Sequence, residues 1–118
     1  MSKLTIGIMP RDQFQQRVLN IAAGKSKVEK NEPKIWFSSI KSLGEVLNDN
    51  NVRLLQLIKK RRPKTLKELA QLSGRHPSNL SRTLKTMEKH GIVELKREAR
   101  QVRPIAKATE FDIHYAIG

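Results

Sequence analysis

The chain has no cysteine among its 118 residues. Without thiols it can form neither a disulfide framework nor a thiolate metal site, and this composition is compatible with a reducing cytoplasm. No apolar run is long enough to cross a membrane, and the first residues lack the charged-then-apolar pattern of a signal peptide. We therefore expect a cytoplasmic protein with no membrane partner.

Acidic residues are also scarce, since Lys and Arg number 24 against 11 Asp and Glu. Residues 52–107 alone hold 16 basic and 4 acidic side chains, a net charge of +12, whereas residues 1–51 carry +3 and residues 108–118 carry −2. A basic field concentrated in one segment indicates a polyanionic partner. Nucleic acid is favoured over membrane because no strongly basic amphipathic anchor is present.

Catalytic and metal-binding patterns are absent from the sequence. The three histidines, His76, His90 and His114, have no spacing typical of a metal site or a triad, and the carboxylates are scattered. Nothing resembles a nucleophile with its base. We predict a protein that is not an enzyme, with no cofactor and no metal.

One amphipathic helix dominates the basic segment. Pro77 suits its first position and Gly91 its end, although His76 stands where Asp or Ser more often caps such a helix. Its apolar stripe consists of Leu80, Leu84 and Met87. The opposite face holds hydroxyl, amide and cationic groups, which contact base edges and phosphates, and Glu88 points sideways. That face comprises Ser78, Arg82, Lys85 and Lys89, with Asn79 and Thr86 beside it.

A shorter helix precedes this one. Thr65-Leu-Lys-Glu68 has the form of a capping box, and Gly74 ends the helix that it opens. Ala70, Gly74 and Leu80 follow the usual helix-turn-helix order of small residue, turn glycine and buried aliphatic residue. A supporting helix from Val52 to Arg62 comes before them, with a stripe of Val52, Leu55 and Ile58 that Leu54 and Leu57 broaden. Taken by itself, the amphipathic pattern of residues 77–91 is also typical of an ordinary surface helix, which is the alternative interpretation.

A hairpin is predicted after Gly91. Residues 92–96 alternate as a strand, residues 97–100 make a turn, and residues 101–108 return antiparallel. A hairpin directly after a reading helix is a wing, suited to the DNA backbone or an adjacent minor groove, and a solvated basic edge is the alternative. Its tip cations are Lys96, Arg97, Arg100 and Arg103.

The two ends of the chain lie outside the basic segment. Residues 4–8 and 111–115 alternate as strands, residues 12–23 have helical spacing, and residues 25–33 form an unpatterned linker. Trp36-Phe37 indicates core packing or an interface anchor, and a further helix begins near Ser39. Because isolated strands are unstable in water, the terminal strands must pair within one chain or between two. We favour a homodimer.

From Ser42 onward these residues resemble a MarR-like winged helix-turn-helix. The resemblance rests on residues 52–62, 64–70, 77–84 and 91–95. The whole chain is also similar to small prokaryotic DNA-binding proteins in which a stretch like Glu32–Ser38 precedes the winged helix. The resemblance implies an antitoxin-type regulator that represses its own operon, with a toxin as protein partner.

The sequence thus predicts an α+β fold, a winged helix-turn-helix with an N-terminal strand–helix extension and a C-terminal strand. Residues 1–47 form the extension, 48–108 the DNA-binding domain and 109–118 the terminal strand. The predicted function is sequence-specific regulation of transcription on double-stranded DNA, and the alternative is a toxin-neutralising module with only non-specific DNA affinity. RNA binding is disfavoured because no aromatic residue lies among the cations of residues 52–107. The predicted DNA contacts are Ser78, Asn79, Ser81, Arg82, Lys85, Lys89, Thr65, Lys96, Arg97, Arg100 and Arg103.

Overall fold

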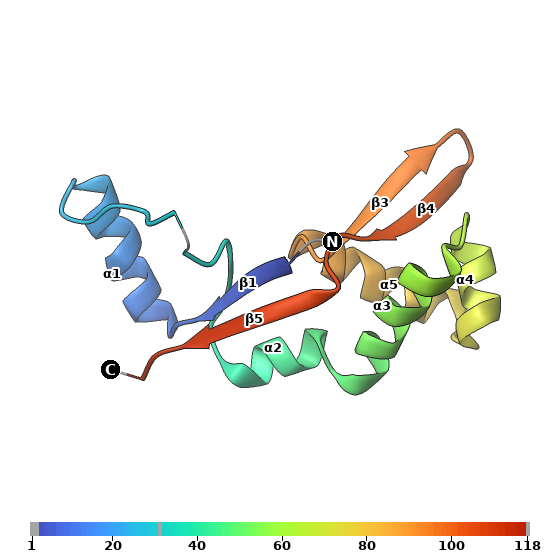
Figure 1. The fold of residues 1–118 in the computed structure, drawn as a ribbon, viewed down its shortest axis with the longest axis horizontal. Coiled ribbons are helices and arrows are strands. Elements are labelled where there is room, and N and C mark those ends of the chain that lie inside the picture. Colours follow the sequence, from blue (N-terminus) through green and yellow to red (C-terminus); the bar gives the residue numbers. More distant parts are fainter. Residues whose placement is uncertain (1–2, 31, 118) are drawn as a thin grey trace.

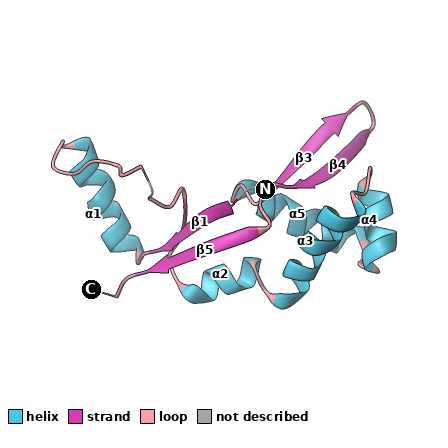
Figure 2. Cartoon of the chain, in the orientation of Figure 1, coloured by secondary structure: helices cyan, strands magenta, loops and turns pink. Residues whose placement is uncertain are grey.

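A computed structural model describes residues 3–30 and 32–117 of the chain. These residues form a mixed α+β fold of five helices, a three-stranded parallel sheet and an antiparallel hairpin, 49 × 28 × 25 Å in extent (Figures 1 and 2). The α+β prediction is confirmed, and the arrangement is consistent with a winged-helix-like one. In chain order the elements are β1 (Lys3–Ile8), α1 (Arg11–Ala22), β2 (Ile35–Phe37), α2 (Ile40–Val46), α3 (Asp49–Arg61), α4 (Leu66–Ser73), α5 (Pro77–Lys89), β3 (Val93–Glu98), β4 (Gln101–Ala106) and β5 (Glu110–Tyr115).

The parallel sheet joins the two ends of the chain. Its strand order is β2-β1-β5, so the predicted terminal strands pair with each other within one chain. Ile6 pairs with Ile113 on one side and with Ile35 on the other. The third strand, β2, had no strand prediction, because three residues are too few to show an alternating pattern.

The aromatic pair in β2 divides between two roles. Phe37 is buried in the core, as expected for core packing. Trp36 is half-buried and lies over Gly7 of β1, where an added Cβ would come within 2.4 Å of the indole ring. The ring also contacts α1, with the Phe14 centroid 5.7 Å away and the Arg17 guanidinium 4.9 Å from its centre. Gly7 is therefore needed for this close approach, and Trp36 attaches α1 to the sheet.

Helix α1 has the predicted helical spacing but packs differently from what the pattern indicates. None of its residues is buried, and Val18 and Leu19 are 46% and 61% exposed. The helix stands apart from α3, α4 and α5, beyond the end of the sheet (Figure 1). Of the apolar residues at helical spacing, Phe14 and Ile21 are half-buried and Val18 and Ala22 are exposed, so this stripe is only partly covered although its sequence pattern is typical of a core-facing helix.

The main core lies where α2 to α5 meet the sheet and the hairpin. Asn48 caps α3 by accepting a hydrogen bond from the Asn51 N–H at 2.9 Å. Of the predicted stripe of α3, Leu54, Leu55 and Ile58 are buried, whereas Val52 and Leu57 are only half-buried. Arg62 ends the helix with φ of 47° just before Pro63. Among the described residues no helix is long and apolar enough to span a membrane.

Candidate nucleic-acid interface

Helix α4 begins with a hydrogen-bonded cap at Thr65. The Thr65 hydroxyl oxygen accepts from the Glu68 N–H at 3.0 Å, as predicted. The Glu68 carboxylate, however, accepts from the Lys64 N–H at 3.1 Å and not from that of Thr65, so the reciprocal half of the predicted capping box is wrong. Two backbone N–H groups at the start of the helix, those of Lys64 and Glu68, are nevertheless satisfied by side chains. Gly74, with φ of +71°, ends α4 in the left-handed conformation that glycine favours.

Helix α5 begins only three residues after α4, beyond Gly74, Arg75 and His76, and its inner side is packed in the core. The stripe of Leu80, Leu84 and Met87 is confirmed, with exposed fractions of 1%, 0% and 0%. A helix seated this firmly presents its outer side chains in a fixed orientation, which recognition of base edges requires.

His76 is the cap of α5. Its Nδ1 atom accepts from the Ser78 N–H at 3.3 Å and lies 2.8 Å from the Ser78 hydroxyl oxygen. The imidazole thus replaces the usual Asp or Ser cap. The Ser78 hydroxyl, one of the predicted DNA contacts, already has a partner here and would have to share it with a phosphate or a base.

The outer face of α5 carries unneutralised cations. Arg82, Lys85 and Lys89 are exposed and form no ion pair with any residue that the structure describes. Glu88 lies off this face, as predicted, and its carboxylate is 3.4 Å from Arg97 of β3. The face therefore combines three cations with no competing carboxylate.

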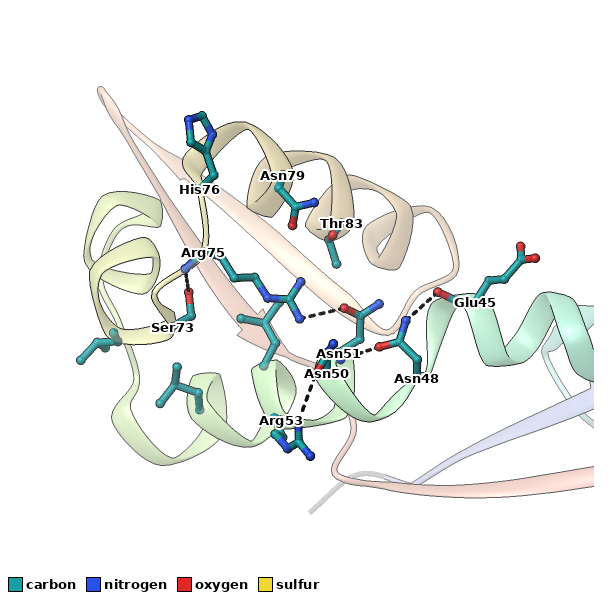
Figure 3. A pocket seen from close by; sticks show the side chains of 13 residues that line it. Glu45, Asn48, Asn50, Asn51, Arg53, Ser73, Arg75, His76, Asn79 and Thr83 are labelled. Atoms are coloured by element: carbon teal, nitrogen blue, oxygen red, sulfur yellow. Dashed lines mark hydrogen bonds between the residues drawn. The ribbon is translucent and has the colours of Figure 1, made fainter.

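The remaining polar residues of α5 occupy its two flanks. Ser81 is half-buried, so only part of it is open to a ligand. Thr86 is exposed and its hydroxyl donates to the Arg82 carbonyl oxygen at 3.1 Å. Asn79 and Thr83 lie on the same flank as Thr86, across the helix from Ser81, and they line a polar pocket of about 970 Å³ between α5 and the start of α3 (Figure 3).

Arg75 crosses the floor of this pocket. Its guanidinium donates to the Asn51 side-chain oxygen at 3.0 Å (Figure 3). The buried Asn51 side-chain amide donates in turn to the Val46 carbonyl oxygen at 2.9 Å. This chain of bonds ties the turn before α5 to the α2–α3 junction. Sequence reasoning missed Arg75, and its only signal was a cation within a short turn, since Asn51 lies 24 residues away.

The hairpin places its cations on two sides. The turn consists of Ala99 and Arg100 alone, with Ala99 at φ of 51°, so the predicted four-residue turn is wrong because Arg97 and Glu98 continue β3. Side chains alternate along a strand, so Arg97, which faces Glu88 of α5, lies on the opposite face from Lys96.

Lys96 and Arg103 are partners across the hairpin and share one carboxylate. Glu98 lies 3.6 Å from the Lys96 ammonium and 3.4 Å from the Arg103 guanidinium. The structure therefore does not bring the four tip cations together. Arg100, in the exposed turn, is the one among them that has no ion pair with a described residue.

His90 closes α5 at its C-terminal end and packs against the core. Its ring centroid lies 4.5 Å from that of Phe37. Burial lowers the pKa of His90 below its ordinary value of 6.5, and the neighbouring Lys89 ammonium lowers it further. The folded chain thus favours a neutral imidazole at this position.

We expect the free energy of unfolding to depend on the charge of His90. Because the folded-state pKa is below 6.5, its contribution is fully present above that pH and is lost as the pH falls from 6.5 through the lowered folded value. Urea titrations at a series of pH values should show this decline in the wild type. His90→Gln should weaken the decline, whereas His114→Gln on exposed β5 should keep it, and an unchanged decline in His90→Gln would contradict the assignment.

No group of three or more His, Cys, Asp or Glu residues in the described ranges is placed to hold a metal ion. No curated protein matches the chain. A family model described only as HVO_A0114 matches residues 46–113, which cover α3 to α5, the hairpin and the start of β5. The match includes the whole α4–α5 pair and extends over more than half of the sequence. The chain belongs to the HVO_A0114 family.

Proposed function

We propose that the chain is a sequence-specific regulator of transcription that binds double-stranded DNA through a winged helix-turn-helix and represses its own operon in the cytoplasm. The observation that carries the proposal is the outer face of α5. Arg82, Lys85 and Lys89 stand there without ion pairs among the described residues, on a helix whose opposite side is buried. Helices of this kind insert into a major groove, where cations bind phosphates and Arg reads guanine.

Each predicted contact has a role under this proposal. Asn79, Ser81 and Arg82 reach base edges, while Thr65, Ser78, Lys85 and Lys89 bind the flanking phosphates. In the wing, Arg100 meets the backbone first. The other three wing cations are Lys96, Arg97 and Arg103, and they exchange their bonds to Glu88 or Glu98 for bonds to phosphate.

The proposal is tested by fluorescence anisotropy on the DNA upstream of the gene and on scrambled duplex of equal length. Neutralising about six phosphates gives a slope of roughly −5 in log affinity against log salt concentration. We expect tighter binding to the upstream DNA, with the preference retained at higher salt. Equal binding to both duplexes, lost together as salt rises, would contradict sequence-specific regulation.

A second function is favoured by one observation on α1. This helix has no buried residue and exposes Val18 and Leu19, so it offers an apolar surface for a protein partner such as a toxin. Such a role is compatible with repression. Co-purification of the chain with the product of the neighbouring gene, abolished by Leu19→Asp, would support it, and no association would contradict it.

A further inference from the structure

Strand β5 lies at the edge of the parallel sheet. Its inner side pairs with β1, and no other strand of the described chain pairs with its outer side. Ile113, Tyr115 and Ile117 are 54%, 46% and 91% exposed, so β5 and the residues after it hold three of the seven exposed large hydrophobic residues in the described part of the chain. An unpaired edge of this kind has free backbone N–H and C=O groups that can pair with another strand.

We propose that the partner is a second copy of this chain, paired antiparallel along β5 about a two-fold axis at Ile113. An axis at one residue makes the interface self-complementary, because every contact is made twice except that between the two Ile113 side chains on the axis. It also joins two three-stranded sheets into one of six strands and brings the exposed apolar side chains of the two β5 strands next to one another.

The side chains of β5 favour this register over its neighbours. Centring on Ile113 sets Asp112 opposite His114 of the partner subunit, where an imidazole N–H can donate to the carboxylate. It also sets Phe111 opposite Tyr115 of the partner subunit, an aromatic pair across strands. Centring on Asp112 would instead place two carboxylates face to face, and centring on His114 would leave Asp112 opposite Ala116.

The Asp112 carboxylate is already oriented on the face of the sheet that this contact uses. The Lys3 ammonium lies 2.9 Å from it, in the neighbouring strand β1. Strand alternation places His114 on the same face of β5 as Asp112, and Phe111, Ile113 and Tyr115 on the other. Along β5, one face of the joined sheets therefore carries polar side chains that form ion pairs or hydrogen bonds, and the other face carries apolar side chains.

The proposed dimer deepens the proposed function. It rests on that function only for its biological role, which is to present two reading helices to one operator. A two-fold dimer carries two copies of α5 related by symmetry, which is what an inverted-repeat operator requires. Dimerisation itself needs no DNA, so the two ideas fail independently. A chain that prefers its operator but stays monomeric would overturn only the dimer, and a dimer with no DNA preference would overturn only the regulator.

Sedimentation equilibrium of the full chain near neutral pH tests the interface. His114→Asp places a carboxylate opposite Asp112 of the partner subunit at both symmetric positions, and we expect the dimer dissociation constant to rise about tenfold. The double change Asp112→His with His114→Asp exchanges the two groups and should restore most of the affinity. Gln15→Asp on the exposed surface of α1 introduces the same charge away from β5 and should leave dimerisation unchanged.

Ile113→Lys provides an independent test, because it sets two ammonium groups across the axis itself. We expect it to favour the monomer and to remove the hydrogen-exchange protection that amides 110–115 gain as concentration rises. A wild-type chain that is monomeric at every concentration would overturn the proposal. The proposal would also be overturned if Ile113→Lys and His114→Asp formed dimers with the same dissociation constant as the wild-type chain.

Discussion

Replacing Arg82 with alanine is expected to weaken binding to operator DNA by about 1–3 kcal/mol and to relax discrimination at one base pair. Arg82 lies at the centre of the outer face of α5, and it makes no ion pair with any described residue that would compete with a base. A guanidinium in a major groove can bind guanine O6 and N7 with two parallel hydrogen bonds, which no other base pair offers in the same geometry. Its loss therefore affects the specific complex more than the non-specific one.

The measurement is a comparison of anisotropy isotherms for operator and scrambled duplex at one salt concentration. Arg11→Ala is the matched control, because it removes the same charge from an exposed position on α1. The control should lower both affinities slightly and equally, since it changes only the overall field. If Arg82→Ala keeps the full ratio between operator and scrambled DNA, Arg82 is a phosphate contact and the base-reading role is wrong.

The helices of the basic segment were predictable because their signals are local. Pro77, Gly74 and Thr65 mark ends through the backbone conformations and hydrogen bonds that they allow, and these effects extend over a few residues only. The stripe of Leu80, Leu84 and Met87 was correct for a related reason. A core surrounds that helix on one side, so period and burial agree.

The same helical spacing did not predict burial at α1, because the sequence does not show whether a core lies beside that helix. Phe14 and Val18 have helical spacing, yet Val18 is exposed and Phe14 is only half-buried. Burial there depends on where the sheet ends, and that in turn depends on the pairing of β1 with β5 across the whole chain. Such non-local contacts leave no trace in a short window of sequence.

The electrostatics of the candidate site also depended on register. The sequence shows that residues 96–103 are rich in cations but does not show that Lys96 stands opposite Arg103 with Glu98 between them. A turn of two residues instead of four decides this arrangement. The cations of α5 were easier to place, because the helical rotation of 100° per residue is enough to put them on a different face from Glu88.

Leu84→Ala is expected to lower the free energy of unfolding by about 2–5 kcal/mol. Leu84 has no exposed surface and lies in the middle of α5, so truncation leaves a cavity beneath the proposed reading face. The loss is a large part of the roughly 5–15 kcal/mol that stabilises a typical domain. Chemical denaturation followed by circular dichroism should show a lower midpoint with a similar slope.

Leu19→Ala is the matched control for this change, because it removes the same atoms from a helix position that is 61% exposed. It should alter stability by less than about 0.5 kcal/mol. A loss below about 1 kcal/mol in Leu84→Ala would mean that the α4–α5 pair is loosely packed. Since Leu84 touches no DNA under the proposed function, its variant should lose operator and scrambled binding together as the chain unfolds. Arg82→Ala should instead stay folded and lose operator binding more than scrambled binding. This difference separates packing beneath α5 from recognition of bases by α5.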